Sequence, residues 1–385
     1  MSETDAGGRR RVIVVAGMHR AGTSVVARGL MALGLDMGDA LMSADPRMNA
    51  RGFFEDLDIV AMDDALLDAQ GADWKSLALL DGIDWRAGEH AAARDAARRL
   101  LAAKLARTGR FAFKDPRVPR LISFWRCVFD EARVDDAYVI AVRHPRAVID
   151  SLAARDGLDP RRSAWLWLTH LLCALRYTHG RPRVVVDYDL MIEAPHRELA
   201  RIAQALALPP HAPAQAHADS FAREFVSGEL RHAHYAADES TAGLPAGVAE
   251  AHALAQRLAR DDASVSDAGV IAGIDRLFAA HEAMSPLFAY ASSVERIADD
   301  APRLAAELAW ARGALAEATR YSEDLKSAVQ RKDEDLAAAD AYQTDLLATL
   351  ARKEGELVAA HALLDRMRER LVGRMLLRRI ERKPR

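Results

Sequence analysis

The segment Arg11-Val-Ile-Val-Val-Ala-Gly17-Met-His-Arg20-Ala-Gly22-Thr23-Ser24-Val25-Val26 decides the fold of this chain. Its β-branched run predicts a buried strand, residues 17–22 predict a tight turn, and residues 23–33 predict a helix with an apolar period of 3.6. The N–H groups of such a turn and the N-terminus of the helix point to one place, where unpaired donors and the helix dipole favour an anion. The segment therefore predicts an anion-binding cradle. The alternative is that its two glycines only shape an ordinary strand-to-helix turn.

The two glycines have the G-x-x-x-x-G spacing of a nucleotide-binding P-loop, but Thr23 stands where that motif has lysine. NTPases use the lysine on the β- and γ-phosphates, so its absence argues against ATP or GTP chemistry. Arg20 returns a positive charge from inside the loop, and a guanidinium can form two parallel hydrogen bonds with an oxyanion. The hydroxyl groups of Thr23 and Ser24 can also donate to a phosphate. A P-loop-type kinase or NTPase is the second interpretation of this segment.

Length and composition place the chain among globular proteins. Its 385 residues are about half apolar, which suffices for one sizeable core and further material. The two cysteines, Cys127 and Cys173, lie in apolar helical surroundings and indicate a reducing compartment instead of a disulfide framework. The first apolar run is too short for a signal peptide or a membrane span, so we expect a cytoplasmic protein.

The net charge of −3 is unevenly distributed. Nine basic and two acidic residues lie between Arg366 and Arg385, so this tail carries +7 and the rest of the chain −10. The tail is therefore the one segment expected to seek a polyanion. We expect peripheral contact of residues 373–385 with an anionic membrane at the inner face, with a merely solvated basic end as the alternative. No nucleic acid is expected as a partner.

Strands and helices alternate over the first half of the chain. The apolar runs at 12–15, 111–114, 137–142 and 183–189 predict four strands. The alternation predicts an α/β domain over residues 11–208, with a P-loop-like, mostly parallel sheet flanked by helices on both faces. We expect residues 1–10 to be disordered and residues 209–290 to form a linker and a helical extension, in which we place no chemistry.

Charged residues follow the second and third predicted strands. Lys114 ends the second strand and Arg117 follows it, and Arg143 comes directly after the third. Carboxyl ends of strands face the crevice where open α/β sheets bind ligands, so these residues are candidate anion ligands, with surface ion pairs as the alternative. Ser151 is eight residues beyond Arg143 in a predicted helix, which keeps both near one strand-to-helix junction. An exposed arginine and an ordinary helical serine would give the same pattern.

A long loop at residues 35–54 separates the first helix from the next. Compact domains usually connect elements in a few residues, so a loop of this length beside a phosphate cradle favours a function. Glu55 directly follows the loop and is expected to open a helix that ends near Ala69. It is a candidate general base, and the alternative is that it complements the dipole of that helix.

Heptad periodicity dominates the end of the chain. Counting in sevens from Leu308 to Leu371 and from Leu304 to Met367 gives twenty positions, of which sixteen are apolar. This pattern predicts a C-terminal coiled-coil helix over residues 300–372 and a homo-oligomer through it. Polar residues interrupt the apolar seam at Ser322, Lys332, Gln343 and Lys353. The alternative is a long helix that packs on the globular part.

Two of these motifs together resemble the PAPS-dependent sulfotransferase family. The loop Gly17-Met-His-Arg-Ala-Gly-Thr-Ser24 and the Arg143-His-Pro segment with its serine at 151 match the family's two donor-binding elements in order and spacing. The segments Lys114-Asp-Pro-Arg117 and Tyr188-Asp-Leu190 are similar to bacterial members that act on carbohydrates or other alcohols. The resemblance covers residues 10 to 235 and weakens after 210.

The resemblance implies a role for each matching residue. The loop would hold the 5′-phosphosulfate of PAPS (3′-phosphoadenosine 5′-phosphosulfate) through His19, Arg20, Ala21, Gly22, Thr23 and Ser24. Arg20 would stabilise the transferring sulfuryl group, Arg143 and Ser151 would hold the 3′-phosphate, and Glu55 would be the base. Arg231, in a late basic segment, would be a further anion ligand. Val25 stands where cytosolic members have an adenine-stacking tryptophan, which argues against close kinship with them.

Three functions follow from the sequence. The first is a sulfotransferase that moves a sulfuryl group from PAPS to a hydroxyl of a saccharide, glycolipid or similar acceptor, without a metal. The second is the P-loop kinase or NTPase. The third is a non-catalytic coiled-coil scaffold whose site is inert.

Overall fold

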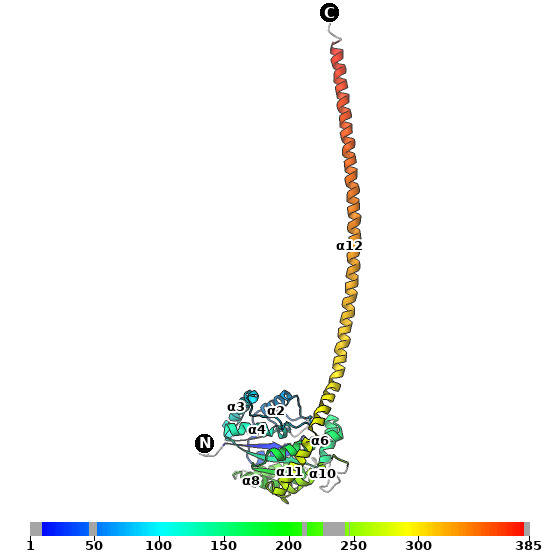
Figure 1. The fold of residues 1–385 in the computed structure, drawn as a ribbon. Coiled ribbons are helices and arrows are strands. Elements are labelled where there is room, and N and C mark those ends of the chain that lie inside the picture. The colour runs from blue at the N-terminus through cyan, green and yellow to red at the C-terminus, as the bar shows by residue number, and fades with distance from the viewer. Residues whose placement is uncertain (1–9, 46–51, 210–213, 226–242, 246, 381–385) are drawn as a thin grey trace. The chain divides into compact units, whose positions relative to one another are not determined.

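The computed structural model describes residues 10–45, 52–209, 214–225, 243–245 and 247–380 (Figure 1). The chain divides into two units, residues 1–295 and residues 296–385. The sheet of the first unit comprises β1 (Arg11–Ala16), β2 (Arg110–Lys114), β3 (Asp135–Val142) and β4 (Arg183–Asp187). Its longer helices before β4 are α1 (Thr23–Ala32), α2 (Leu57–Ala69), α3 (Ala91–Thr108), α4 (Val118–Ala132), α5 (Pro145–Asp156) and α6 (Pro160–Tyr177). Those after it are α7 (Tyr188–Glu193), α8 (Pro195–Ala205), α9 (Ala214–Ser220), α10 (Val248–Ala259) and α11 (Ala268–Glu282). The last helix, α12 (Ser285–Ile380), begins in the first unit and continues through the second.

The four strands form a parallel sheet in the order β2-β1-β3-β4. The predicted α/β class with a P-loop-like parallel sheet is therefore confirmed. Because the chain moves from β1 to one side and then returns to the other, the carboxyl end of β1 lies at the point where the strand order reverses. Open α/β sheets bind ligands at such a point.

Both faces of the sheet are covered by helices. Along β1, Val12 and Val14 face one apolar cluster, which includes residues of α2 to α6, α10 and α11. Ile13 and Val15 face a second cluster, to which α1, α7 and α8 contribute. Strands buried on both faces read as continuous apolar runs, which is why their positions were predictable from composition.

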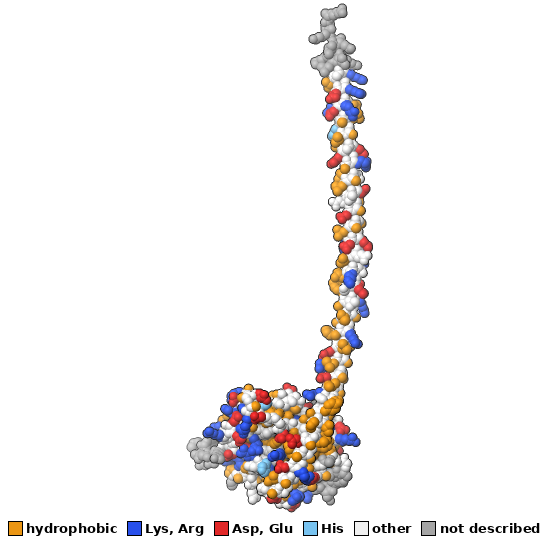
Figure 2. All heavy atoms as spheres, viewed as in Figure 1, with side chains coloured by type: hydrophobic (Ala, Val, Ile, Leu, Met, Phe, Trp, Pro, Cys, Tyr) orange, Lys and Arg blue, Asp and Glu red, His pale blue; other side chains and the backbone are white. Residues whose placement is uncertain are grey.

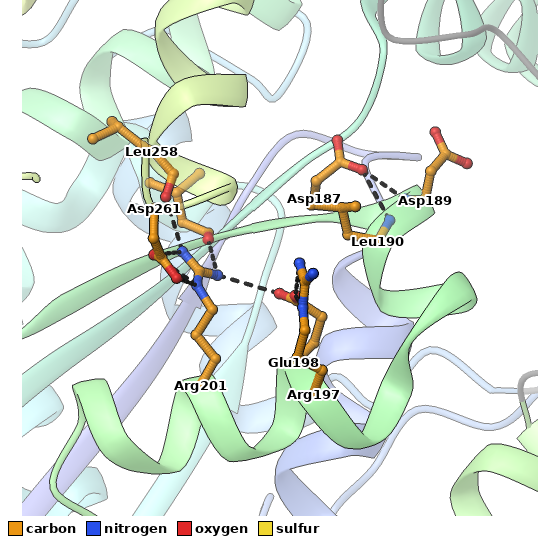
Figure 3. Close-up of polar contacts among 9 residues, drawn as sticks. Asp187, Asp189, Leu190, Arg197, Glu198, Arg201, Leu258 and Asp261 are labelled. Carbon is orange, nitrogen blue, oxygen red and sulfur yellow. Dashed lines mark hydrogen bonds and ion pairs between the residues drawn. The ribbon is translucent and has the colours of Figure 1, made fainter. Parts of the chain in front are cut away.

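Two of the element boundaries that differ from the sequence prediction are set by aspartate side chains that cap a helix. The fourth strand ends at Asp187 instead of residue 189, because the Asp187 carboxylate accepts hydrogen bonds from the N–H groups of Asp189 and Leu190 and so starts α7 (Figure 3). Likewise, Glu55 does not open its helix. The N-cap of α2 is Asp56, whose carboxylate accepts from the N–H of Asp58.

Arg201 of α8 ties the late helices to the sheet. Its guanidinium donates to the Val185 carbonyl of β4 at 2.8 Å and to the Leu258 carbonyl of α10 at 2.9 Å, and it pairs with Asp261 at 2.8 Å (Figure 3). The buried Glu198 accepts from the same guanidinium at 3.2 Å. Since α10 and α11 also supply residues to the first apolar cluster, they complete the core of the α/β unit.

The C-terminal helix α12 continues without a break to Ile380. This confirms the long helix that the heptads predict, while its pairing into a coiled coil stays a prediction. Within the described residues, no helix offers a stretch both long and apolar enough to traverse a lipid bilayer.

Candidate anion-binding site

The glycine loop joins β1 to α1 with two residues in the left-handed region of backbone conformation. Arg20 has φ 68° and Gly22, the N-cap of α1, has φ 88°. A Cβ at Gly22 would lie 2.5 Å from Cδ2 of Tyr188, and one at Gly17 would lie 2.8 Å from the Ala141 carbonyl oxygen. Both glycines are therefore required by close approach, and the loop is pressed against β3 and α7.

Three of the predicted ligands meet at this loop. The Nε of Arg20 donates to Oγ of Ser151 in α5 at 2.7 Å. Nη1 of Arg143, which follows β3, donates to the Arg20 carbonyl at 3.5 Å. The loop and the Arg143 segment, separated by more than a hundred residues, thus form one site at the carboxyl edge of the sheet.

Positive charge is concentrated here. Among the described residues, no carboxylate lies within ion-pair distance of Arg143, which is only 8% exposed. Its guanidinium instead lies 4.3 Å from the centre of the Tyr188 ring, a cation–π contact. Burial, followed by the charges of Arg155 and Arg143, lowers the pKa of Arg20. A buried excess of cations is the electrostatic signature of an anion site.

His19 lies in the loop as a neutral side chain. Burial lowers its pKa well below the ordinary value, and the nearby cations Arg155, Lys114 and Arg117 lower it further. Its ring centroid lies 4.4 Å from that of Trp74, and within the described part of the chain its buried Nε2 has no hydrogen-bond partner. A neutral imidazole with an unpartnered nitrogen can donate to a ligand oxygen.

The hydroxyl groups of Thr23 and Ser24 have different surroundings, and Ser24 is the less buried of the two residues. Thr23 is buried together with Ala21, whereas Oγ of Ser24 donates to the Phe53 carbonyl at 3.3 Å. The hydrogen bond from Ser24 to Phe53 holds the end of the long loop against the start of α1.

Glu55 and Lys114 form a buried ion pair. Nζ of Lys114 donates to Oε1 of Glu55 and, at 3.2 Å, to the Phe53 carbonyl. Both side chains are nearly fully buried. Lys114, expected as an anion ligand, therefore has protein partners that hold the candidate base beside the end of β2.

Arg117 also has carboxylate partners. It pairs with Asp115 at 2.9 Å and with Asp64 at 2.5 Å. Asp115 in turn lies beside Asp63, which accepts from the Trp125 indole at 2.8 Å. Burial and the charge of Asp115 raise the pKa of Asp63 well above its ordinary value. Arg231, the last predicted ligand, lies outside the described residues.

Lys104 of α3 occupies the one group of three carboxylates that could hold a cation among the described residues. Its Nζ lies 2.7 Å from an oxygen of each of Asp39, Asp56 and Asp58. These hydrogen bonds raise the pKa of Lys104 despite its burial. The ammonium takes the place a metal ion would need, and it links Asp39 of the long loop and the first residues of α2 to α3.

Sequence reasoning missed two residues around the site. Trp74 packs on His19 and has Lys75 and Arg155 within 5.5 and 5.8 Å of its ring. Arg155, one turn beyond Ser151, pairs with Asp156 at 2.7 Å. Nothing in the spacing of Trp74 marks it, because it is brought to the loop from an irregular segment. Arg155 follows Ser151 by four residues, and this helical spacing could have identified it.

Comparisons with solved structures find distant likenesses. No family model matches the chain, and no curated protein matches it. Among solved structures, it is similar to the sulfotransferase domain of the Synechococcus PCC 7002 olefin synthase, with 17% identity and a TM-score of 0.34, over 69% of this chain and 99% of that one. It is also similar to retinol dehydratase in complex with androsterone and the inactive cofactor PAP, with 16% identity and a TM-score of 0.28, over 56% of this chain and 65% of that one. At these scores, any function has to be argued from the geometry of the site itself.

Proposed function

We propose that this chain is a PAPS-dependent sulfotransferase that moves a sulfuryl group to a hydroxyl of a saccharide, glycolipid or similar acceptor. One observation carries the proposal: Arg20 of the glycine loop is hydrogen-bonded to Ser151, and Arg143 donates to the Arg20 carbonyl. A phosphosulfate on the loop and a 3′-phosphate on Arg143 and Ser151 would then belong to one continuous ligand site. ATP lacks the 3′-phosphate, so the same pair would discriminate against it.

The residues suit sulfuryl transfer, in which positioning and charge stabilisation do most of the work, as in phosphoryl transfer. The acceptor oxygen forms a bond to sulfur while the bond from sulfur to the donor's bridging oxygen breaks, and the leaving phosphate keeps the electron pair. Arg20 would stabilise the charge on the bridging oxygen and on the sulfuryl oxygens. His19, neutral and with an unpartnered nitrogen, would donate to the same group. The proposal assigns no step to a metal.

Glu55 is the proposed base that takes the acceptor proton. Lys114 contacts its Oε1, which leaves Oε2 as the oxygen proposed to meet the hydroxyl. Glu55→Gln keeps the shape of the side chain but cannot accept that proton. We expect it to lower kcat by on the order of a hundredfold while changing the affinity for the donor little.

Binding of 3′-phosphoadenosine 5′-phosphate (PAP) tests the proposal directly. We expect PAP to raise the melting temperature of the full chain, since a ligand at a hundred times its Kd stabilises by about 2.7 kcal/mol. Arg20→Ala and Arg143→Ala should abolish this shift. The matched control is Arg276→Ala, which removes an exposed arginine of α11 that pairs with Glu250. Stabilisation by Mg·ATP and not by PAP would favour a kinase or NTPase and refute the proposal.

Transfer from ³⁵S-labelled PAPS to a panel of polysaccharides, lipid-linked sugars and small alcohols would identify the acceptor. Label transfer that requires both Arg20 and Glu55 supports the assigned roles. The cytoplasmic location and the membrane contact of residues 373–385 stay predictions, and sedimentation with phosphatidylserine vesicles tests the second. If the chain binds neither PAP nor ATP, the inert scaffold becomes the preferred interpretation.

A further inference from the structure

The apolar seam of α12 is exposed along its length. At the heptad positions from 304 to 371, each leucine, valine and methionine side chain is between 48 and 68% exposed. Figure 2 shows hydrophobic side chains recurring along the helix between charged ones. An exposed stripe of this length indicates a binding surface, and a heptad stripe fits another helix of the same kind. We infer that its occupant is a second copy of this chain, bound in an antiparallel two-stranded coiled coil in which residue i faces residue 675 − i of the partner.

The spacing of the polar interruptions selects this register. Ser322 and Gln343 belong to the set that contains Leu308 (the a positions) and are 21 residues apart; Lys332 and Lys353 belong to the set that contains Leu304 (the d positions) and are also 21 apart. In an antiparallel pair, a positions meet d positions. The equal spacing allows Ser322 to face Lys353 and Gln343 to face Lys332 at the same time, so every polar seam residue meets another polar one.

The same register matches large side chains with small ones. Of the ten distinct layers, four place leucine against alanine: 315 with 360, 336 with 339, 357 with 318, and 364 with 311. The other four apolar layers pair 308 with 367, 329 with 346, 350 with 325, and 371 with 304. Alternation of large and small residues fills an interface without cavities. Because residue 304 faces residue 371, every seam position of one chain also faces a seam position of the other.

A parallel pair would be poorly matched. It would place Lys332 against Lys332 and Lys353 against Lys353, and it would stack alanine on alanine at positions 311, 318, 339 and 360. Like charges in a seam repel, and small pairs leave gaps. In the helix, each seam lysine already pairs with an acidic residue three positions on, Asp335 at 3.7 Å and Glu356 at 3.0 Å.

Charge at the two ends also favours the antiparallel arrangement. Residues 366–380 carry a net charge of +5, and residues 295–309, which would face them, carry −2. In a parallel pair the basic segment would lie against its own copy. Glu307 and Arg370 flank the seam at opposite ends and would approach each other in the antiparallel register.

Disulfide trapping in the full chain tests the inference. Ala311→Cys and Leu364→Cys variants should cross-link when the two are mixed, equilibrated and oxidised, because residue 311 faces residue 364 of the partner. In an antiparallel dimer of the Leu364→Cys variant alone, the two introduced cysteines would lie about 80 Å apart, because the helix rises 1.5 Å per residue. We expect on the order of tenfold more cross-linked dimer from the mixture than from either variant alone. Native Cys127 and Cys173 are buried and need not be removed.

Two controls make the result decisive. Trp310→Cys lies outside the seam and is 78% exposed, so its cross-linking measures random collisions. Sedimentation equilibrium should give twice the mass of one 42.2 kDa chain. A monomer, a trimer, or equal cross-linking of each single variant would overturn the inference.

A second variant tests the cause of the orientation. Lys332→Leu with Lys353→Leu removes the like-charge layers of the parallel arrangement. In this background, homodimeric cross-linking of Leu364→Cys should rise several-fold, because an apolar seam selects orientation weakly. If cross-linking stays confined to the mixture, the lysines do not select the orientation and the argument from polar layers is wrong.

Discussion

Two clusters of charge in the α/β unit contain a buried cation, and they differ in whether that cation has carboxylate partners. At Lys104, one ammonium is surrounded by three carboxylates at 2.7 Å. At the glycine loop, the guanidinium of Arg143 lies against a carbonyl and an aromatic ring, with no carboxylate of the described chain in ion-pair range. In the first cluster the protein itself supplies the opposite charges, whereas we propose that a bound anion supplies them in the second. Burial of charge by itself is therefore a weak sign of function, whereas buried charge of one sign is a strong one.

The largest expected change in the free energy of unfolding comes from removing the ammonium of Lys104. Lys104→Ala leaves the fully buried Asp56 carboxylate without its ammonium, so we expect a loss of about 4 kcal/mol in the free energy of unfolding. Urea denaturation of the full chain measures it. Lys104→Met combined with Asp56→Asn removes both charges and should recover most of the loss. A change below about 1 kcal/mol would show that the cluster is not structural.

Removal of a cation from the glycine-loop site should lower activity more than folding stability. Arg20→Ala is expected to cost on the order of 3 kcal/mol in transition-state stabilisation, measured as kcat with labelled PAPS. The free energy of unfolding should change little, because the repulsion from Arg143 and Arg155 is relieved at the same time. A loss of folding stability as large as that of Lys104→Ala would contradict the distinction between the two clusters.

Ser151→Ala gives a smaller change at the same site. The hydroxyl accepts from Arg20 at 2.7 Å, and a single hydrogen bond of this kind contributes about 1 kcal/mol, or roughly a fivefold weaker affinity for PAP. Isothermal titration calorimetry measures it. Ser293→Ala, which removes a hydroxyl of α12 bonded to the Tyr290 carbonyl, is the control. An unchanged affinity would argue that Ser151 only orients Arg20.

The smallest change in the free energy of unfolding is expected at Asp63, whose carboxyl group lies beside that of Asp115. Its raised pKa means that the folded chain keeps a proton that the unfolded chain loses above about pH 4, so this group lowers stability as pH rises. Asp63→Asn is uncharged at every pH, and its amide can still accept from Trp125 and donate to Asp115. At pH 5 we expect the free energy of unfolding of this variant to lie within about 0.5 kcal/mol of the wild-type value. At pH 8 we expect the variant to be more stable relative to wild type than it is at pH 5. A relative loss that grows with pH would contradict the direction of the shift.

How far the sequence alone leads can be judged at particular residues. The strands were predictable because runs such as Val12 to Val15 are apolar, and the loop was predictable because Gly17 and Gly22 have the G-x-x-x-x-G spacing. The boundary at Asp187 was missed, because a side-chain cap competes with strand extension and composition does not decide between them. For Lys114 and Arg117 the sequence left anion binding and ion pairing open, and in the structure both have carboxylate partners from the segment 55–64. The approach of Trp74 to His19 had no local signal at all.

The sequence by itself determined the elements of this protein: the α/β alternation, the loop with its arginine, and the heptads of α12. These depend on local periodicity and on glycine conformation, which neighbouring residues suffice to encode. The tertiary structure alone decided which charges are paired. Lys104 and Arg143 are both buried cations, and only the folding of distant segments gives three carboxylates to one and no carboxylate of the described chain to the other. The reason is physical: the energy of a charge depends on what surrounds it in space, which the order of residues along the chain does not specify.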